Sequence, residues 1–206
     1  NKIMNNKAKF DVVIFGGTFD PIHIGHLKVA KLTLEYLKVD QIVFVPAGDP
    51  YLKSNKRKIT NSELRLEMIR LALKDENEPK FSISDVEIKK NGPSYTLDTV
   101  IEFKKKKIKP IVLLGIDSVL SMIDWEDPES LIKETKILAI ARPGFNVSDL
   151  KNLKIKGINQ AVTILEINTP DITSSDIRNR IKTEKSIKNM VSPRVETFIR
   201  KKKIYK

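Results

Sequence analysis

Both histidines of the chain lie within one eleven-residue stretch, "GGTFDPIHIGH", at residues 16–26. His23 and His26 are three residues apart, and three glycines and a proline share the stretch with them. An imidazole can donate a hydrogen bond to a phosphate oxygen, and this bond strengthens as negative charge builds up on the oxygen. The concentration of both imidazoles beside a glycine pair therefore indicates phosphate chemistry.

The glycines indicate how an anion would be bound there. Gly16 and Gly17 allow a sharp turn after an apolar run and let a ligand approach the backbone without meeting a Cβ. Gly25 opens an expected helix, whose free N–H groups and positive dipole end favour an anion. His23 and His26 are spaced to point from the first turn of this helix toward the same anion. The dinucleotide and P-loop glycine patterns do not match this stretch.

Two alternatives compete with phosphate binding. The first is a glycine turn with two structural histidines. The second is a metal site, but no third ligand at a familiar spacing accompanies the histidines, so we predict no metal ligands on the protein. The chain contains no cysteine, which excludes disulfides, thiolate catalysis and cysteine-bound zinc.

A second anion site is predicted at "ITSSDIRNRI", residues 172–181. Ser174 or Ser175 can cap a helix that begins there, and Arg178 would lie on its first turn or just beyond. A plain capped helix with an exposed arginine is the alternative. Together with the first site, this element could hold the other end of a triphosphate.

Apolar runs alternate with helical periodicity along the chain, which predicts an α/β fold. We expect a Rossmann-like, doubly wound, mostly parallel sheet with helices on both faces and a ligand at the carboxyl ends of its strands. The longest candidate loop covers residues 47–60. The expected strands are 10–15, 41–46, 81–88, 110–115, 136–141 and 162–167, and the expected helices are 25–38, 62–74, 94–106, 117–134 (broken), 174–183 and 192–202.

Length and composition set further limits. A chain of 206 residues with 40% apolar residues suggests one domain, residues 4–206, with residues 1–3 left over from cloning. The net charge of +12 is interpreted as solvated lysines, because the lysine runs 104–107 and 200–203 end expected helices, and a small polyanionic substrate is preferred over nucleic acid. With no apolar run near 18 residues, we expect no membrane partner and a cytoplasmic protein. The oligomeric state stays open, a homo-oligomer included.

The glycine and histidine stretch resembles the signature of the HIGH-motif nucleotidyltransferase superfamily. Other blocks resemble bacterial nicotinate-nucleotide adenylyltransferases along nearly the whole chain. The family's G-x-S-Y-T-x-D-T, G-x-D followed by tryptophan, R-P-G-aromatic and I-S-S-T-x-I-R elements are similar to residues 91–100, 113–125, 141–145 and 172–178 of this sequence.

The resemblance implies adenylyl transfer from ATP to nicotinate mononucleotide, with Mg²⁺ bound mainly through the ATP phosphates. Nicotinamide mononucleotide, pantetheine phosphate and a nonenzymatic nucleotide or nucleic-acid binding module are the alternatives. The resemblance assigns catalytic roles to His23, His26 and Arg178. It assigns ATP binding to Gly16, Gly17, Thr18, Phe19, Gly25, Gly115, Asp117, Ser174 and Ser175.

For the mononucleotide, the resemblance implies that Trp125 stacks on the pyridine ring and that the backbone near Thr96 and Glu126 meets the carboxylate. Tyr95 and Arg142 are expected to shape this pocket. Lys53 falls where the family has the last residue of P-P-H-[KR], although this chain has "DPYLK" there. A solvated loop lysine is the alternative for Lys53.

Overall fold

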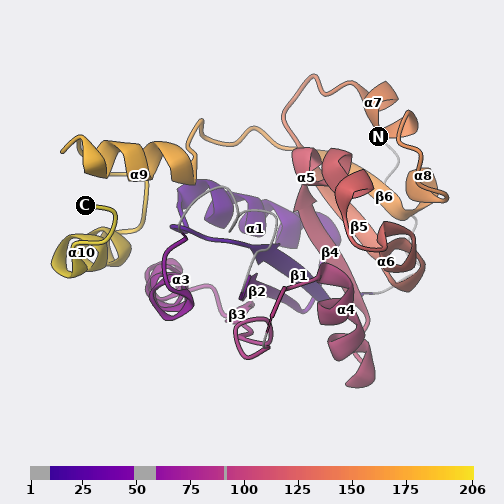
Figure 1. Cartoon of the computed structure of the whole chain (residues 1–206), viewed down its shortest axis with the longest axis horizontal. Helices are drawn as coiled ribbons and strands as arrows, with labels where there is room; N and C mark the ends of the chain where they lie inside the picture. The colour runs from indigo at the N-terminus through magenta and orange to yellow at the C-terminus, as the bar shows by residue number, and fades with distance from the viewer. Residues whose placement is uncertain (1–9, 49–58, 91) are drawn as a thin grey trace.

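The computed structural model describes residues 10–48, 59–90 and 92–206. Its centre is a sheet of six strands in the order β3-β2-β1-β4-β5-β6, and every neighbouring pair is parallel (Figure 1). This confirms the α/β fold expected from the sequence. The strands are β1 (Val12–Gly17), β2 (Gln41–Pro46), β3 (Phe81–Ile83), β4 (Pro110–Gly115), β5 (Lys136–Ala141) and β6 (Val162–Glu166).

Helices connect and follow the strands. The described helices are α1 (Ile24–Leu37), α3 (Ser62–Glu76), α4 (Thr96–Lys105), α5 (Ile116–Leu120), the 3₁₀ helix η1 (Ser121–Asp124), α6 (Pro128–Glu134), α7 (Val147–Lys151), α8 (Ile158–Ala161), α9 (Ser174–Lys182) and α10 (Pro193–Lys202). The expected broken helix is α5, η1 and α6, interrupted where Asp127 adopts a left-handed conformation before Pro128. The strand expected over 81–88 was too long, because the chain enters a turn at 86–88. Helices α7 and α8 were not expected.

Side chains on the two faces of the sheet form two apolar cores. Along β1, Val13 and Phe15 point into one core, whereas Val12 and Ile14 point into the other. The first core is completed by α1, α3, α9 and α10, and the second by α4, α5, η1, α6, α7 and α8. The alternation within each strand is the two-residue period of β structure. Both faces are therefore covered, as an all-parallel sheet requires.

The strand order reverses between β1 and β4. From β1 the chain continues to β2 and then to β3 on one side of the sheet. The next strand, β4, pairs with β1 on its other side, and β5 and β6 follow there. Open parallel sheets bind ligands in the crevice at this switch point, beyond the carboxyl ends of the strands. The glycine and histidine stretch lies there, because β1 ends at Gly17 and α1 begins at Ile24.

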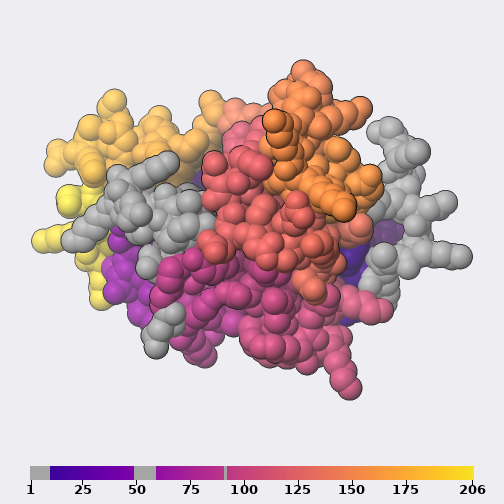
Figure 2. Space-filling model, turned by 45° about the vertical axis from the view of Figure 1, so that its right-hand side comes forward, coloured from indigo at the N-terminus to yellow at the C-terminus, as the bar shows by residue number. Residues whose placement is uncertain are grey.

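The last helices return to the first half of the molecule. Helix α10 packs against α3, and Figure 2 shows these yellow and purple segments side by side at one edge. In the parts of the chain that the structure describes, no helix has the length and apolar character needed to cross a membrane.

Candidate active site

The turn that follows β1 is fixed by aromatic packing. Phe19 adopts a left-handed backbone conformation, with φ of 47°, and its ring covers Gly17. A Cβ at Gly17 would lie 3.0 Å from Cζ of Phe19, so this position needs glycine for close approach. The Phe19 ring also packs edge-on against Phe15, with centroids 5.5 Å apart. The turn is thereby held over the carboxyl end of β1.

His26 faces the crevice from the first turn of α1. The backbone N–H of His23 donates to Nδ1 of His26 at 3.2 Å. Since Nδ1 accepts, the proton of the neutral His26 ring is assigned to Nε2, which becomes a donor. His26 lines the groove beyond β1, so this side chain can offer a hydrogen bond to an anion there.

His23 lies behind His26 and does not face the same anion as we expected. It is the N-cap residue of α1, its side chain is buried, and its ring stacks beside that of His26 with centroids 3.7 Å apart. Burial lowers the pKa of His23 to about 4, so the ring is neutral at pH 7. Gly25 provides room for this ring, because a Cβ there would lie 3.0 Å from it.

Most of the predicted phosphate-binding residues, but not His23 or Gly25, meet in one groove of about 430 Å³. Its walls come from the β1 turn, the first turn of α1, the end of β4 and the start of α9. Among its lining residues are Gly16, Gly17, Thr18, Phe19, His26, Gly115, Ser118, Ser174, Ser175 and Arg178. Segments more than 150 residues apart in the sequence thus form one surface.

Hydrogen bonds join α9 to the β1 turn. Arg178 donates to the carbonyl oxygen of Asp20 at 2.8 Å and to Oγ of Ser175 at 2.9 Å. Oγ of Ser174 donates to the carbonyl oxygen of Pro21 at 2.9 Å. The cap of α9 corrects our expectation: it is Thr173, whose hydroxyl accepts from the N–H of Asp176 at 3.0 Å. The two serines are left for contacts within the groove.

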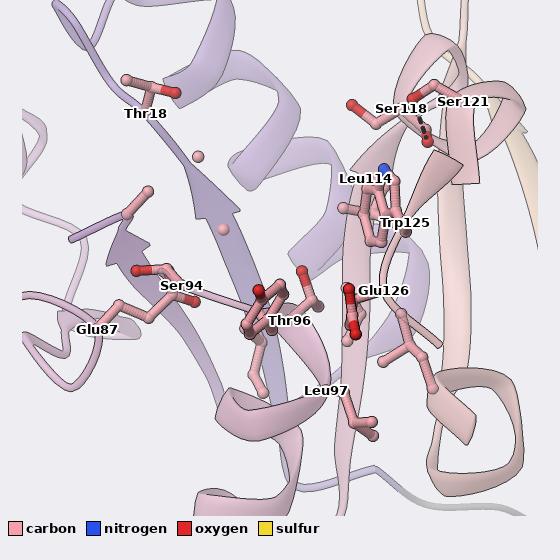
Figure 3. Close-up of a pocket in the computed structure, with 17 residues that line it drawn as sticks. Thr18, Glu87, Ser94, Thr96, Leu97, Leu114, Ser118, Ser121, Trp125 and Glu126 are labelled. Atoms are coloured by element: carbon pink, nitrogen blue, oxygen red, sulfur yellow. Dashed lines mark hydrogen bonds between the residues drawn. The ribbon is translucent and has the colours of Figure 1, made fainter. Parts of the chain in front are cut away.

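A second cavity, of about 240 Å³, adjoins the groove and contains the predicted acceptor residues. Figure 3 shows Trp125 and Glu126 on one side of it, with Glu87 and Ser94 on the opposite side. Tyr95 and Thr96 contribute the start of α4. The residues shared by the cavity and the groove are Gly16, Gly17, Thr18, Leu114 and Ser118.

Sequence reasoning did not single out Glu87 or Ser94, although Ser94 lies inside a motif that it quoted. Oγ1 of Thr99 donates to Oε1 of Glu87 at 2.6 Å, and burial raises the pKa of the Glu87 carboxyl. The N–H of Gly48 donates to Oγ of Ser94 at 3.1 Å. A Cβ at Gly48 would lie 2.0 Å from the carbonyl oxygen of Glu87, so only glycine fits against this wall of the cavity.

Arg142 does not lie where we expected it. It lines a third groove, together with Asp117 and Phe145, and is absent from the lining of the Trp125 cavity. Its guanidinium pairs with Oδ1 of Asp171 at 2.9 Å. The reason is topological: Arg142 follows β5, on the far side of β4 from the acceptor cavity. Lys53 lies outside the described residues.

The third groove continues the phosphate groove on the side away from Trp125. The two share Val29, Gly115 and Ile140, so Asp117 lies beyond the phosphate-binding residues. Three adjoining spaces therefore run along the carboxyl edge of the sheet: the Asp117 groove, the groove with His26 and Arg178, and the Trp125 cavity.

Arg65 was also missed. Its side chain is buried on α3 and donates to four carbonyl oxygens: those of Thr18 at 2.8 Å, Thr60 at 2.8 Å, Ala47 at 2.7 Å and Gly48 at 3.2 Å. Arg65 thus ties the β1 turn to the end of β2. A charged residue on the apolar face of α3, four residues before Ile69 and seven before Ala72, is the signal that could have identified it.

The described residues contain no group of three or more histidine, cysteine, aspartate or glutamate side chains placed to hold a metal ion. The side chains of the groove include the His26 imidazole, the Arg178 guanidinium and the hydroxyl groups of Thr18, Ser118, Ser174 and Ser175. These are donors for an anion.

Fold and site together define a protein of the α/β nucleotide-binding class, with a groove beyond β1 that adjoins two further pockets. The family model described as cytidylyltransferase-like matches residues 14–180. With the relatives described next, this shows that the chain belongs to the cytidylyltransferase-like family and, within it, to the nicotinate-nucleotide adenylyltransferases.

Relatives match over nearly the whole chain. The probable nicotinate-nucleotide adenylyltransferase of Clostridium tetani is 36% identical over 198 residues, covering 94% of this chain and 98% of the relative. That of Caldicellulosiruptor saccharolyticus is 38% identical over 197 residues, covering 95% and 98%. These similarities confirm the resemblance recognised in the sequence.

Solved structures share the fold. Plasmodium falciparum nicotinic acid mononucleotide adenylyltransferase complexed with NaAD matches with a TM-score of 0.74 and 22% identity, covering 95% of this chain and 97% of that one. The same enzyme complexed with APC matches with a TM-score of 0.71 and 21% identity, covering 94% and 96%.

Proposed function

We propose that this chain transfers the adenylyl group of ATP to nicotinate mononucleotide, forming nicotinate adenine dinucleotide and releasing pyrophosphate. The observation that carries the proposal is the shared wall between the phosphate groove and the Trp125 cavity. Thr18 and Ser118 belong to both spaces, so phosphates bound in one can meet an acceptor bound in the other. The names of the relatives support the same reaction.

The reaction needs charge neutralisation and alignment rather than a general base. The acceptor phosphate is already anionic, and one of its oxygens forms a bond to the α-phosphorus while the bond from that phosphorus to the bridging oxygen breaks. Pyrophosphate leaves with the electron pair. In-line positioning of two substrates can supply about 7–11 kcal/mol of the barrier reduction.

The groove residues fit this task. Nε2–H of His26, the guanidinium of Arg178 and the N–H groups of the β1 turn can donate to phosphate oxygens as negative charge develops on them. The buried, neutral His23 supports the His26 ring from behind. Asp117, in the adjoining groove, is assigned to the ribose or adenosine of ATP.

The Trp125 cavity fits the acceptor. Trp125 offers a ring on which pyridine can stack. The first turn of α4, beginning at Thr96, and the backbone at Glu126 offer N–H groups to the carboxylate, which the helix dipole favours as well. Two donors suit the two oxygens of a carboxylate better than an amide, which has one acceptor oxygen.

Magnesium enters this proposal as the companion of ATP. A divalent cation prefers carboxylate and carbonyl oxygens. The carboxylate on the described walls of the groove is that of Asp20, and its oxygens already accept from Tyr205 and Thr60. We therefore assign magnesium to the ATP phosphates, where it would neutralise part of their charge.

The direct test measures pyrophosphate release from ATP with three acceptors: nicotinate mononucleotide, nicotinamide mononucleotide and pantetheine phosphate. We expect kcat/KM for the acid to exceed that for the amide by at least about tenfold, the scale of one lost charge-assisted bond. Equal or inverted preference would refute the acceptor assignment. Absence of pyrophosphate with all three would refute the enzyme assignment.

His26→Ala tests the groove within the same assay. We expect turnover about two to three orders of magnitude lower, the scale of losing a transition-state donor, with little change in melting temperature. Lys28→Ala, at an exposed position on the same helix, is the matched control and should retain wild-type turnover. An active His26→Ala enzyme would contradict the assignment.

A further inference from the structure

The chain that follows α10 returns to the turn beside the phosphate groove. After α10 ends, the N–H of Ile204 donates to the carbonyl oxygen of Ile199 at 3.1 Å, and the Ile204 side chain is buried. The next residue, Tyr205, packs against the core that contains α1 and α3. Its hydroxyl donates to Oδ1 of Asp20 at 2.7 Å, across 185 positions of sequence.

Asp20 is part of the β1 turn and is almost completely buried, with 1% exposure. Oδ2 of its carboxylate also accepts from the N–H of Thr60, at a long 3.5 Å. Burial, together with the neighbouring Asp20 carboxylate, raises the pKa of the Tyr205 hydroxyl well above its ordinary value. The hydroxyl therefore keeps its proton and remains a donor throughout the neutral pH range.

The same residue, Asp20, holds the arginine of the groove. Its carbonyl oxygen accepts from Arg178 at 2.8 Å, while its side chain accepts from Tyr205. Next to it, the carbonyl oxygen of Pro21 accepts from Ser174. A displacement of Asp20 would therefore move the acceptor to which the Arg178 guanidinium is bound.

We propose that Tyr205 is a positioning residue for adenylyl transfer, which acts through Asp20 to align Arg178 with the ATP phosphates. This inference rests on the proposed function. Tyr205 lines neither the phosphate groove nor the Trp125 cavity, so its effect reaches substrate through the residues it contacts, of which Asp20 accepts its hydroxyl hydrogen bond. The effect should appear on the ATP side and leave binding of the acceptor unchanged.

Tyr205→Phe removes one oxygen and keeps the packed ring. Compared with the wild type, we expect kcat/KM for ATP to fall about tenfold, the scale of a modest misalignment, with KM for the mononucleotide within twofold. Tyr36→Phe removes the hydroxyl of an exposed tyrosine on α1 and is the matched control, with kinetics like those of the wild type.

A double-mutant cycle separates positioning from a purely structural role. If Tyr205 acts through Arg178, most of the effect of Tyr205 should be lost once Arg178 is replaced by lysine. Adding Tyr205→Phe to Arg178→Lys should then lower kcat/KM by less than threefold relative to Arg178→Lys alone. Two outcomes would overturn the proposal by indicating a general loss of structure. One is that the effects of Tyr205→Phe and Arg178→Lys on kcat/KM multiply in the double variant. The other is that Tyr205→Phe raises KM equally for both substrates.

Two further measurements keep the test decisive. If Tyr205→Phe does not fold, Asp20→Asn retains an acceptor oxygen for the hydroxyl and should keep kcat/KM above that of Asp20→Ala by about tenfold. If the wild type releases no pyrophosphate, the proposed function fails. Calorimetric titration with ATP then still tests the role of Tyr205, by comparing the ATP affinity of Tyr205→Phe with that of the wild type. Wild-type ATP affinity in Tyr205→Phe, or Asp20→Asn and Asp20→Ala of equal activity, would overturn the inference.

Discussion

Two imidazoles three residues apart acquire different properties from their surroundings. His26 lines the phosphate groove and has its Nδ1 occupied by a backbone N–H, which leaves Nε2 as the donor. His23 is buried beside it, and burial lowers its pKa to about 4. One histidine thus presents a hydrogen-bond donor to the groove, and the other packs beside it as a neutral ring.

The lowered pKa of His23 makes stability depend on pH. Because the folded pKa of about 4 lies below the unfolded value of 6.5, the unfolded chain binds the proton more readily between these pH values. The stability that neutral His23 contributes is complete above pH 6.5 and decreases as pH falls toward 4, by about 3 kcal/mol in all.

Urea unfolding at pH 7.0 and near pH 4 measures this loss. The carboxylates of the chain titrate in the same range, so the wild type is compared with His23→Asn, in which the imidazole is absent. We expect the free energy of unfolding of the variant to depend less steeply on pH, by about 3 kcal/mol across the interval. Parallel curves would contradict a buried, neutral His23.

At the scale of elements, the site depends on bonds from helices α3 and α9 to the β1 turn, which lies far from both in the chain. Helix α3 holds the β1 turn and the exit of β2 through Arg65, and α9 holds the same turn through Arg178 and Ser174. The turn is therefore fixed from two sides. Its N–H groups can then present a constant geometry to phosphate, because preorganised donors need no rearrangement during the reaction.

Arg65→Met tests the fixation by α3. The methionine fills much of the space but leaves the carbonyl groups of Thr18, Ala47, Gly48 and Thr60 without this donor, and each buried unsatisfied group costs about 1–3 kcal/mol. We expect the free energy of unfolding to fall by at least about 3 kcal/mol.

The matched control for this change is Arg70→Met. Arg70 lies on the same helix, and its side chain is 56% exposed. It forms an ion pair with Glu67, three residues earlier on that helix. The control should change stability by no more than about 0.5 kcal/mol in chemical denaturation. Equal effects of the two substitutions would show that the buried hydrogen bonds of Arg65 contribute nothing specific.

For the molecule as a whole, the net charge of +12 favours anionic substrates. The groove adds backbone N–H groups and the Arg178 guanidinium at its wall. Attraction of this kind is long-ranged and is screened by salt, with a Debye length of about 10 Å at 0.1 M ionic strength. We further propose that residues 4–206 act as one domain around the switch point of the sheet.

Salt should weaken ATP binding more than binding of an uncharged analogue. Between 20 and 300 mM NaCl, we expect the Kd for ATP to rise about three- to tenfold, since several exposed cations attract the triphosphate. Adenosine carries no charge and serves as the comparison, with a Kd that changes less than twofold. Equal salt dependence of the two ligands, measured by calorimetry, would rule out this electrostatic contribution.

Much of the fold could be predicted because it is encoded locally. The β-branched run ending at Gly17 and the apolar spacing of Leu27, Ala30 and Leu34 specify a strand and the helix after it without knowledge of distant residues. The same is true of the α9 start, where the serine-rich segment indicated a helix although Thr173 is its cap. The strand at β3 was expected, but its end at Ile83 could not be predicted, because the apolar pattern continues past the point where the chain turns.

The sequence by itself determined the alternation of strands and helices and the family, because each depends on residue types at fixed short spacings, and it predicted phosphate chemistry for residues 16–26. Only the tertiary structure decided that His23 lies behind His26, that Arg142 belongs to another groove, and that Arg65 and Tyr205 hold the β1 turn. These outcomes depend on contacts between residues up to 185 positions apart, which no local pattern records.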